Sequence, residues 1–374
     1  MKKLILVLGV SVNIVNLIAQ ITPPKRKVQL VILFDTSNSM DGLIEQAKSR
    51  IWAIVNEVSG LRYAGETPLL EIAMYDYGND GLSASSNFIR QQIPFTTNLD
   101  VVSEKLFALR TNGGSEFCGA VIQKSLDDLN WSNNAQDLKL IYIAGNEPFN
   151  QGPINYKEVC SKASLKGVFV NTIYCGDALQ GIREFWKDGA TCSNGEYFNI
   201  NSNEKIVYIE TPYDDLIQQQ NLKLNGTYMG YGSNYEYNIS NQHAQDANAK
   251  VQSISVASER IIVKSKKSAY KNTDWDVVDA IEADSAFLSK VKDEELPNEL
   301  KGKTKEEQEI IIKEKAKERE EIQTEIGRLA LEREKFIQEE KKKRNESGGT
   351  GEKDDFGSAI SKSLKETAKS LGFE

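Results

Sequence analysis

Residues 28–40 read Val-Gln-Leu-Val-Ile-Leu-Phe-Asp-Thr-Ser-Asn-Ser-Met, and this stretch decides the fold class that we predict. An apolar run ends in Asp35, and Ser37 and Ser39 follow at alternate positions. Such a run, bounded by polar turn residues, predicts a strand buried on both faces of a parallel sheet. Open α/β sheets bind their ligands just beyond the carboxyl ends of their strands. One carboxylate and two hydroxyls there are hard oxygen donors, which suit Mg2+ or Mn2+.

Apolar runs and helical stripes alternate on the carboxyl side of this stretch, up to about residue 209. The runs predict strands at 70–78, 88–93, 138–144, 168–174 and 196–200. The stripes predict helices at 43–58, 99–109, 117–129, 154–165 and 182–186, and a last helix of the domain at 214–224. This βα alternation predicts an α/β fold with a doubly wound, mostly parallel sheet and helices on both faces.

Two later segments carry polar residues between predicted elements. The first reads Arg-Thr-Asn-Gly-Gly-Ser-Glu at 110–116, and the second reads Ile-Ala-Gly-Asn-Glu-Pro at 143–148. Taken with 35–39, in this order, they resemble the three metal loops of a von Willebrand factor type A domain. The resemblance implies the Rossmann-like fold of that family and a metal-ion-dependent adhesion site. It also implies that Asp35, Ser37, Ser39 and Ser115 hold a divalent cation whose open position accepts an acidic side chain of a partner protein.

The third loop departs from the family pattern, because Gly145 stands where the family has Asp. Glu147 is the candidate substitute in this loop. Losing one carboxylate weakens a site for Mg2+, or for Mn2+ or Ca2+. The remaining carboxylate of Asp35 only partly compensates a divalent charge, which favours an outside carboxylate. The alternative is structural: Asp and Ser also cap helices after strands, and glycines also serve turns.

The amino-terminal segment and the extent of the resemblance indicate the cellular location of the protein. Residues 1–19 have Lys2 and Lys3, a short apolar core and a small residue at the end, which is typical of a secretory signal peptide. An uncleaved anchor is the alternative, and no later segment is apolar enough to cross a bilayer. The resemblance extends through 114–119, 145–149, 172–176 and 186–189 to secreted bacterial type A proteins with a helical tail. We therefore expect a periplasmic, cell-envelope or extracellular protein.

Four cysteines in an exported chain suggest disulfides. Cys175 and Cys192 flank a short connection between predicted strands, so we expect that pair, which leaves Cys118 with Cys160. Buried free thiols are the alternative.

Composition excludes several classes of function. The net charge of −8 argues against a nucleic-acid partner, whose phosphates require a basic face. The single histidine, His243, excludes a zinc site with several histidines and a Ser-His-Asp arrangement. A carboxylate pair of Asp35 with Asp76 or Glu147 has no accompanying nucleophile. We therefore predict a protein that is not an enzyme.

The carboxyl-terminal part changes in character. We predict a type A-like domain at 20–226, a polar linker at 227–270 and a helical module at 271–374. A long helix at 304–343 and a short amphipathic helix at 356–371 should form an antiparallel hairpin, because the apolar seam is too sparse for a confident coiled coil. This module is either a docking arm, through which copies of the chain can self-associate, or a cap that adds stability. A metal-free scaffolding protein acting through this arm is the alternative to the cation-dependent binding protein.

Overall fold

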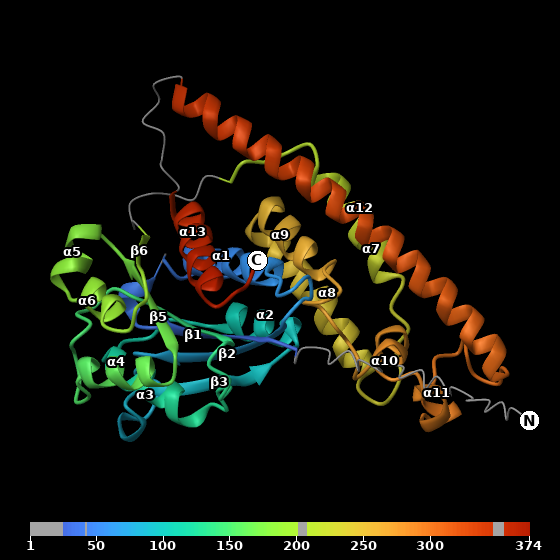
Figure 1. Cartoon of the computed structure of the whole chain (residues 1–374), viewed down its shortest axis with the longest axis horizontal. Helices are drawn as coiled ribbons and strands as arrows, with labels where there is room; N and C mark the ends of the chain where they lie inside the picture. Colours follow the sequence, from blue (N-terminus) through green and yellow to red (C-terminus); the bar gives the residue numbers. More distant parts are fainter. Residues whose placement is uncertain (1–24, 42, 201–207, 347–354) are drawn as a thin grey trace, which may run out of the picture.

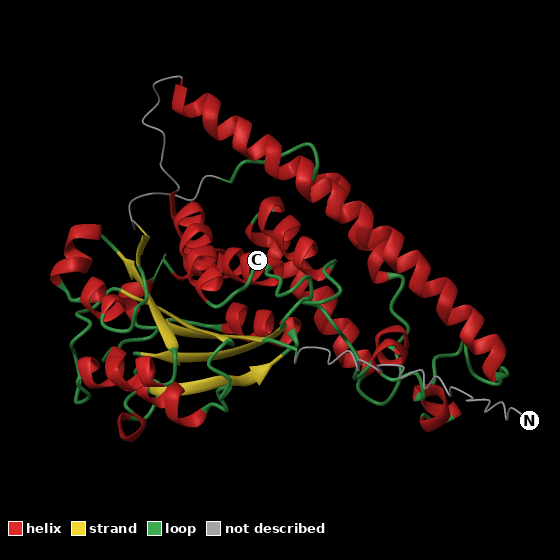
Figure 2. Cartoon of the chain, viewed as in Figure 1, coloured by secondary structure: helices red, strands yellow, loops and turns green. Residues whose placement is uncertain are grey.

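The structure is a computed structural model that describes residues 25–41, 43–200, 208–346 and 355–374. A layered α/β unit lies beside a layer of helices, and one long helix crosses that layer (Figures 1 and 2). The signal peptide predicted at 1–19 lies outside the described residues. Within the described part of the chain, none of the helices combines the length and apolar character that a bilayer span needs.

The predicted doubly wound sheet is confirmed. Its strands are β1 (Lys27–Asp35), β2 (Leu69–Tyr77), β3 (Ile89–Thr96), β4 (Leu138–Gly145), β5 (Val168–Cys175) and β6 (Tyr197–Ile200). Their spatial order is β3-β2-β1-β4-β5-β6, and all neighbours are parallel except β2 and β3. The chain runs from β1 toward one edge and returns to β4 on the other side of β1. The ends of β1 and β4 therefore flank a topological switch point, where such sheets bind ligands.

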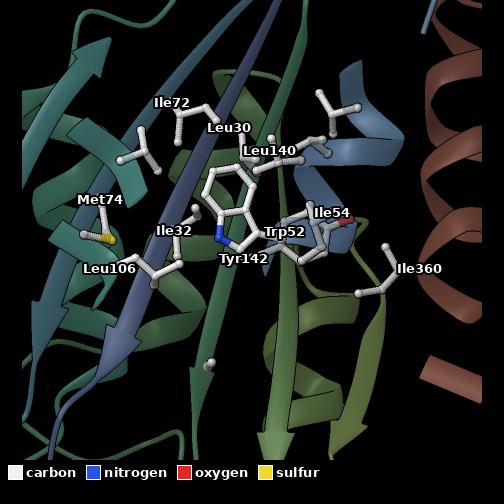
Figure 3. Close-up of a cluster of buried hydrophobic side chains, with 14 of the residues drawn as sticks. Leu30, Ile32, Trp52, Ile54, Ile72, Met74, Leu106, Leu140, Tyr142 and Ile360 are labelled. Atoms are coloured by element: carbon white, nitrogen blue, oxygen red, sulfur yellow. The ribbon is translucent and has the colours of Figure 1, made fainter. Parts of the chain in front are cut away.

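Helices cover both faces of this sheet. The first face is covered by α1 (Ile44–Gly60) and α2 (Leu99–Ala108), and the second by α3 (Cys118–Asp128), α4 (Tyr156–Leu165) and α6 (Trp186–Thr191). A short helix, α5 (Ala178–Arg183), precedes α6. Successive β1 side chains alternate, so that Leu30 and Ile32 enter the first core and Val31 the second. Figure 3 shows Trp52 of α1 within the first core.

The polar linker predicted at 227–270 is wrong, because this segment folds into α8 (Tyr235–Gln252) and α9 (Ile254–Lys264). α8 packs on α2, and α9 packs on α1 and on α7 (Asp214–Asn225). The amide side chains that suggested a linker are buried and hydrogen-bonded instead. Gln242 Nε2 donates to the Tyr270 hydroxyl at 2.9 Å, and Gln245 Nε2 donates to Asn241 Oδ1 at 2.8 Å. Satisfied amides are tolerated inside a protein, so tertiary packing decided the fold of this segment.

The remaining helices are α7 (Asp214–Asn225), α10 (Val277–Ala283), α11 (Phe287–Lys290), α12 (Lys305–Glu346) and α13 (Asp355–Ser370). Short 3-10 turns lie at Asn38–Met40, Ala84–Ser86 and Asp293–Glu295. The structure has a long helix and a short helix close to the predicted bounds. α12 has 42 residues, which corresponds to about 60 Å of helix.

The predicted antiparallel hairpin of these two helices is wrong. α12 packs on α7, α9 and α10, whereas α13 packs on α1 and β6 (Figure 1). The apolar stripe of α13, with Ile360, Leu364 and Ala368, completes the core over the first face of the sheet. Burial against this sheet-side core decided where α13 docks.

The predicted disulfide pairing is also wrong. The structure joins Cys160 to Cys192, with 5.6 Å between their Cα atoms, and leaves Cys118 and Cys175 as buried free thiols. Cys175 lies in the core on the first face of the sheet, whereas Cys192 packs against the core on the second face. The sheet therefore separates the pair that chain proximity suggested. The bond instead links α4 to the end of α6 on one face.

Buried ion pairs stabilise the helical layer, and one of them joins it to α2 of the α/β unit. Five acids, Asp100, Asp214, Asp246, Asp276 and Asp279, each contact a buried Arg or Lys, and we call this set the paired acids. Arg260 of α9 contacts Asp100 of α2 at 2.5 Å and Asp246 of α8 at 2.8 Å. Lys264 of α9 and two seam positions of α12, Arg319 and Arg333, supply the other cations. Because each buried charge has an opposite partner, the layer avoids an uncompensated desolvation penalty.

Candidate metal centre

The first loop begins where β1 ends, at the switch point of the sheet. Asp35 is fully buried, Ser37 is buried, and Ser39 is exposed. The Ser37 backbone N–H donates to Asp35 Oδ1 at 2.8 Å, and the Ser37 and Ser39 hydroxyl oxygens lie 2.9 Å apart. The structure thus brings together the three predicted residues of this loop, with two hydroxyls directed toward one point beside a carboxylate.

The environment of Asp35 is acidic. Its Oδ2 atom is buried and has no hydrogen-bond partner among the described residues. Burial raises the pKa of Asp35 to about 7; hydrogen bonds from Ser37 oppose this shift, and the nearby carboxylates of Glu116 and Glu147 add to it. In the part of the chain that the structure describes, no Lys or Arg forms an ion pair with Asp35. A buried carboxylate without a counter-charge is costly unless it is protonated or meets a cation.

The second loop is held against the first by its backbone. The Asn38 N–H donates to the Gly113 carbonyl oxygen, and the Asn112 N–H donates to the Thr36 carbonyl oxygen, both at 3.0 Å. Gly114 has φ +147°, and a Cβ there would overlap the carbonyl oxygen of Gly78. The glycine is therefore required by a close backbone approach as well as by its conformation.

Ser115, the predicted ligand of this loop, is half-buried. Its side chain makes no hydrogen bond to Asp35, Ser37 or Ser39 in the described structure. The backbone contacts between the two loops place it near this cluster, but the structure does not join it to the other three side chains.

Glu116 is the site residue that sequence reasoning missed. It is buried, and its carboxylate interacts with the Ser37 side chain. Burial raises the pKa of Glu116; hydrogen bonds to its own backbone and to Ser37 oppose the shift, and the carboxylates of Glu147 and Asp80 add to it. The dipole of the next helix does not explain this acid, because α3 begins two residues later and no acid lies in its first turn. The sequence signal that could have identified Glu116 as a site residue is its position directly after Ser115.

The third loop also lies close to Asp35. A Cβ at Gly145 would lie 2.6 Å from the Tyr77 hydroxyl oxygen and 3.1 Å from Asp35 Oδ2. The Tyr77 hydroxyl donates to the Ala144 carbonyl oxygen at 3.0 Å, so a phenol ring fills the space beside this position. An aspartate at 145 does not fit this arrangement.

Two further residues of the third loop have different roles. Asn146 is tied to Ser39: it accepts from the Ser39 hydroxyl at 2.8 Å and donates to the Ser39 carbonyl oxygen at 3.1 Å. Glu147, the predicted substitute, is half-buried, and its Oε2 accepts a long hydrogen bond from Gln151 at 3.5 Å. The amide of Asn146 therefore positions the exposed serine, and Glu147 acts on the site through its charge.

The donor set fits a hard cation. It offers a carboxylate with one free buried oxygen atom and two clustered hydroxyls, with a third hydroxyl on the adjacent loop. Among the described residues, no group of three His, Cys, Asp or Glu side chains has the arrangement of a metal site. A cation here would therefore depend on serine hydroxyls as well as on acids, as oxygen-only coordination permits.

The comparisons with solved structures each cover about half of this chain. No family model and no curated protein matches the chain. Among solved structures, the chain is similar to the conserved hypothetical protein BatB from Bacteroides thetaiotaomicron, at 17% identity over 46% of this chain and 90% of that one (TM-score 0.36). It is also similar to the SpRpn10 VWA domain, at 13% identity over 48% of this chain and 90% of that one (TM-score 0.37).

A third similar structure is proximal thread matrix protein 1 from the mussel byssus, at 11% identity over 48% of this chain and 43% of that one (TM-score 0.37). That protein was solved with a zinc-occupied metal-ion-dependent adhesion motif. Of these three similar structures, one is described as a VWA domain and another as carrying the adhesion motif.

Proposed function

We propose that this chain is a non-enzymatic binding module that holds a divalent cation with Asp35, Ser37, Ser39 and Ser115. The cation would be Mg2+, or Mn2+ or Ca2+, and an acidic side chain of a partner protein would complete its coordination. The observation that supports this proposal most directly is the unpartnered, buried Oδ2 of Asp35 beside two clustered hydroxyls at the switch point.

The electrostatics explain why a cation and an acid would meet here. Asp35 contributes one negative charge, and the serine hydroxyls contribute none, so a bound divalent ion would retain positive charge. Ser39 is exposed, so an outside group can reach this side of the site. A charge-assisted contact with a partner carboxylate is stronger than a neutral hydrogen bond, particularly beside buried groups.

Titration of the full chain with Mg2+ and Mn2+ by calorimetry tests the cation site. The wild type should bind in the millimolar range or tighter, and Ser37→Ala should weaken binding because it removes one hydroxyl ligand. Ser161→Ala is the matched control, since Ser161 is exposed on α4 and its hydroxyl bonds only the Lys157 carbonyl oxygen. Absence of binding by the wild type at millimolar metal would refute the proposal.

We further propose that the chain is exported and meets its partner outside the cytoplasm. The Cys160–Cys192 disulfide supports this location, because disulfides persist in oxidising compartments. A pull-down from the native envelope, with and without a chelator, should recover a partner only when the cation is present. Recovery of the same partner in both conditions would contradict cation-dependent binding.

A metal-free scaffolding protein is the second candidate. Two observations favour it: Gly145 removes the third-loop acid, and α12 exposes Ile310 (58%) and Leu331 (66%). A helix with exposed apolar residues can contact a partner or a second copy of the chain. The double substitution Ile310→Ser and Leu331→Ser should abolish partner recovery for a scaffold and leave it unchanged for a cation-dependent module. Size-exclusion chromatography with light scattering on the same variant tests self-association.

A further inference from the structure

We infer that Glu116 is a second carboxylate ligand of the cation and replaces the acid that the third loop has lost. This inference rests on the proposed cation site and adds a residue to it. Two acids act on Asp35, Glu116 of the second loop and Glu147 of the third. The structure places them in different relations to the hydroxyl cluster.

Glu116 lies against the first loop. It is only 7% exposed, and its carboxylate interacts with the Ser37 side chain, which is itself a proposed ligand. A Cβ at Gly78 would lie 2.8 Å from Glu116 Cγ and 2.9 Å from Asp35 Oδ1. Both acidic side chains therefore lie against the position of this Cβ, and only a glycine at position 78 leaves room for them.

The backbone around Glu116 is shaped for this placement. Gly78 has φ +76° and Gly114 has φ +147°, which are conformations that residues with a Cβ rarely adopt. A Cβ at Gly114 would also lie 2.8 Å from Glu116 Oε1. Two glycines from different loops thus form a cradle around this carboxylate, directed toward Asp35 and Ser37.

The third loop has no room for an acid at the family position. The space beside Gly145 is occupied by the Tyr77 hydroxyl and by the Trp186 ring, whose Cη2 atom would lie 3.0 Å from an added Cβ. Glu147 is less buried than Glu116, and its carboxylate contacts Gln151. The second negative charge has therefore moved from the third loop to the second.

With two buried carboxylates, the site needs a cation to compensate two negative charges. Asp35 and Glu116 are both acids without a basic partner in the described structure, so each makes the other more costly to ionise. A divalent cation bound to both would neutralise the two charges. The chain would then hold its cation before a partner arrives. The residual positive charge expected with Asp35 alone would be gone, so the partner's acid would fill the open coordination position and would no longer be needed to balance charge.

The test is titration of the full chain with Mn2+ and Mg2+, followed by calorimetry and by the loss of the free Mn2+ signal in electron paramagnetic resonance. Glu116→Gln keeps the size of the side chain and removes its charge, so Mn2+ affinity should fall at least about tenfold, because a ligand is lost. Glu147→Gln is the matched control and should stay within about twofold of the wild type. Glu116→Asp keeps the charge on a shorter side chain and should bind with intermediate affinity.

The outcomes separate this inference from the proposed function. If the wild type binds Mn2+ and Glu116→Gln binds equally well, Glu116 is not a ligand, although the cation site stands. If the wild type binds no metal, the proposed function fails as well. Circular dichroism and the thermal midpoint in chelator establish that each variant is folded. If Glu116→Gln does not fold, Glu116→Asp decides, because unchanged affinity in that variant would also overturn the inference.

Discussion

Buried acids occur in two regions of this molecule, and their surroundings are opposite. In the helical layer, each of the paired acids contacts a buried Arg or Lys; Asp246, for example, accepts from Arg260 at 2.8 Å and from Lys264 at 2.7 Å. At the switch point of the sheet, Asp35 and Glu116 are also buried, but the charged groups that act on them are further acids. The protein neutralises its acids in one region and leaves them uncompensated in the other.

This difference distinguishes a structural role from a functional one. A buried pair costs desolvation energy that its own partners offset, so its charges hold α2, α8 and α9 together. A buried acid without a partner destabilises the fold, and such groups concentrate where a ligand supplies the missing charge. The same chemical change should therefore have opposite effects on stability in the two regions.

The largest effect is expected for Asp246→Asn in the helical layer. Burial alone would raise the pKa of Asp246, but Lys264, Arg260 and several hydrogen bonds outweigh burial and lower it. Removing this charge leaves Arg260 and Lys264 undercompensated, so the free energy of unfolding should fall by about 3–5 kcal/mol. Because the folded-state pKa is depressed, the stabilisation by Asp246 is present above about pH 4 and is lost as the pH falls below that value. Urea unfolding at pH 7 and pH 3 measures both effects; a loss below about 1 kcal/mol at pH 7 would contradict the comparison.

Gly145→Asp is a test of whether the family acid can be restored. The new side chain would meet the Tyr77 hydroxyl, the Trp186 ring and Asp35 Oδ2. Overpacking of this kind costs about 1–3 kcal/mol, so the variant should be less stable and should not bind Mn2+ more tightly. Gly145→Ala separates the steric effect from the charge. Tighter metal binding by Gly145→Asp in a stable protein would show that the third loop still accepts a ligand.

Asp35→Asn should change the free energy of unfolding in the opposite direction to Asp246→Asn. The pKa of Asp35 is raised to about 7, so between about pH 4 and pH 7 the folded state binds more protons than the unfolded state, and stability falls as the pH rises. Asparagine removes this cost. In chelator, Asp35→Asn should therefore be more stable than the wild type by about 1–3 kcal/mol at pH 8, and the difference should shrink near pH 4. Thermal or urea unfolding across this range measures it, and a less stable variant at pH 8 would break the comparison.

The smallest effect is the stabilisation of the wild type by its cation. A ligand that binds only the folded state adds about 1.4 kcal/mol at ten times its dissociation constant. Millimolar Mg2+ or Mn2+ should therefore raise the thermal midpoint of the wild type and leave that of Asp35→Asn unchanged. An equal rise in both proteins would indicate binding at another site.

Much of the α/β unit was predictable, because its signals are local. The apolar run that ends at Asp35 identified β1, and the alternation of runs and stripes gave the order of strands and helices. The first-loop residues followed from the same run, since Asp35, Ser37 and Ser39 are close in the chain. Local periodicity and turn chemistry carry this information without knowledge of distant contacts.

The helical layer was harder to predict because its stability comes from distant pairs. The amides of α8 suggested a linker until Tyr270 and Asn241 supplied their hydrogen bonds. Arg319 interrupts the apolar seam of α12 in the sequence, yet it is buried against Asp276, 43 residues away. Neither partner is visible from the local pattern.

The sequence by itself determined the sheet, the position of its switch point and a cluster of one carboxylate and two hydroxyls at that point, because these depend on neighbours in the chain. Only the tertiary structure decided which cysteines pair, where α13 docks and that Glu116 faces Asp35. These depend on which face of the sheet a side chain occupies and on which loops the backbone brings together. Burial then decided the chemistry, since an acid becomes part of a candidate site only where the fold leaves it without a counter-charge.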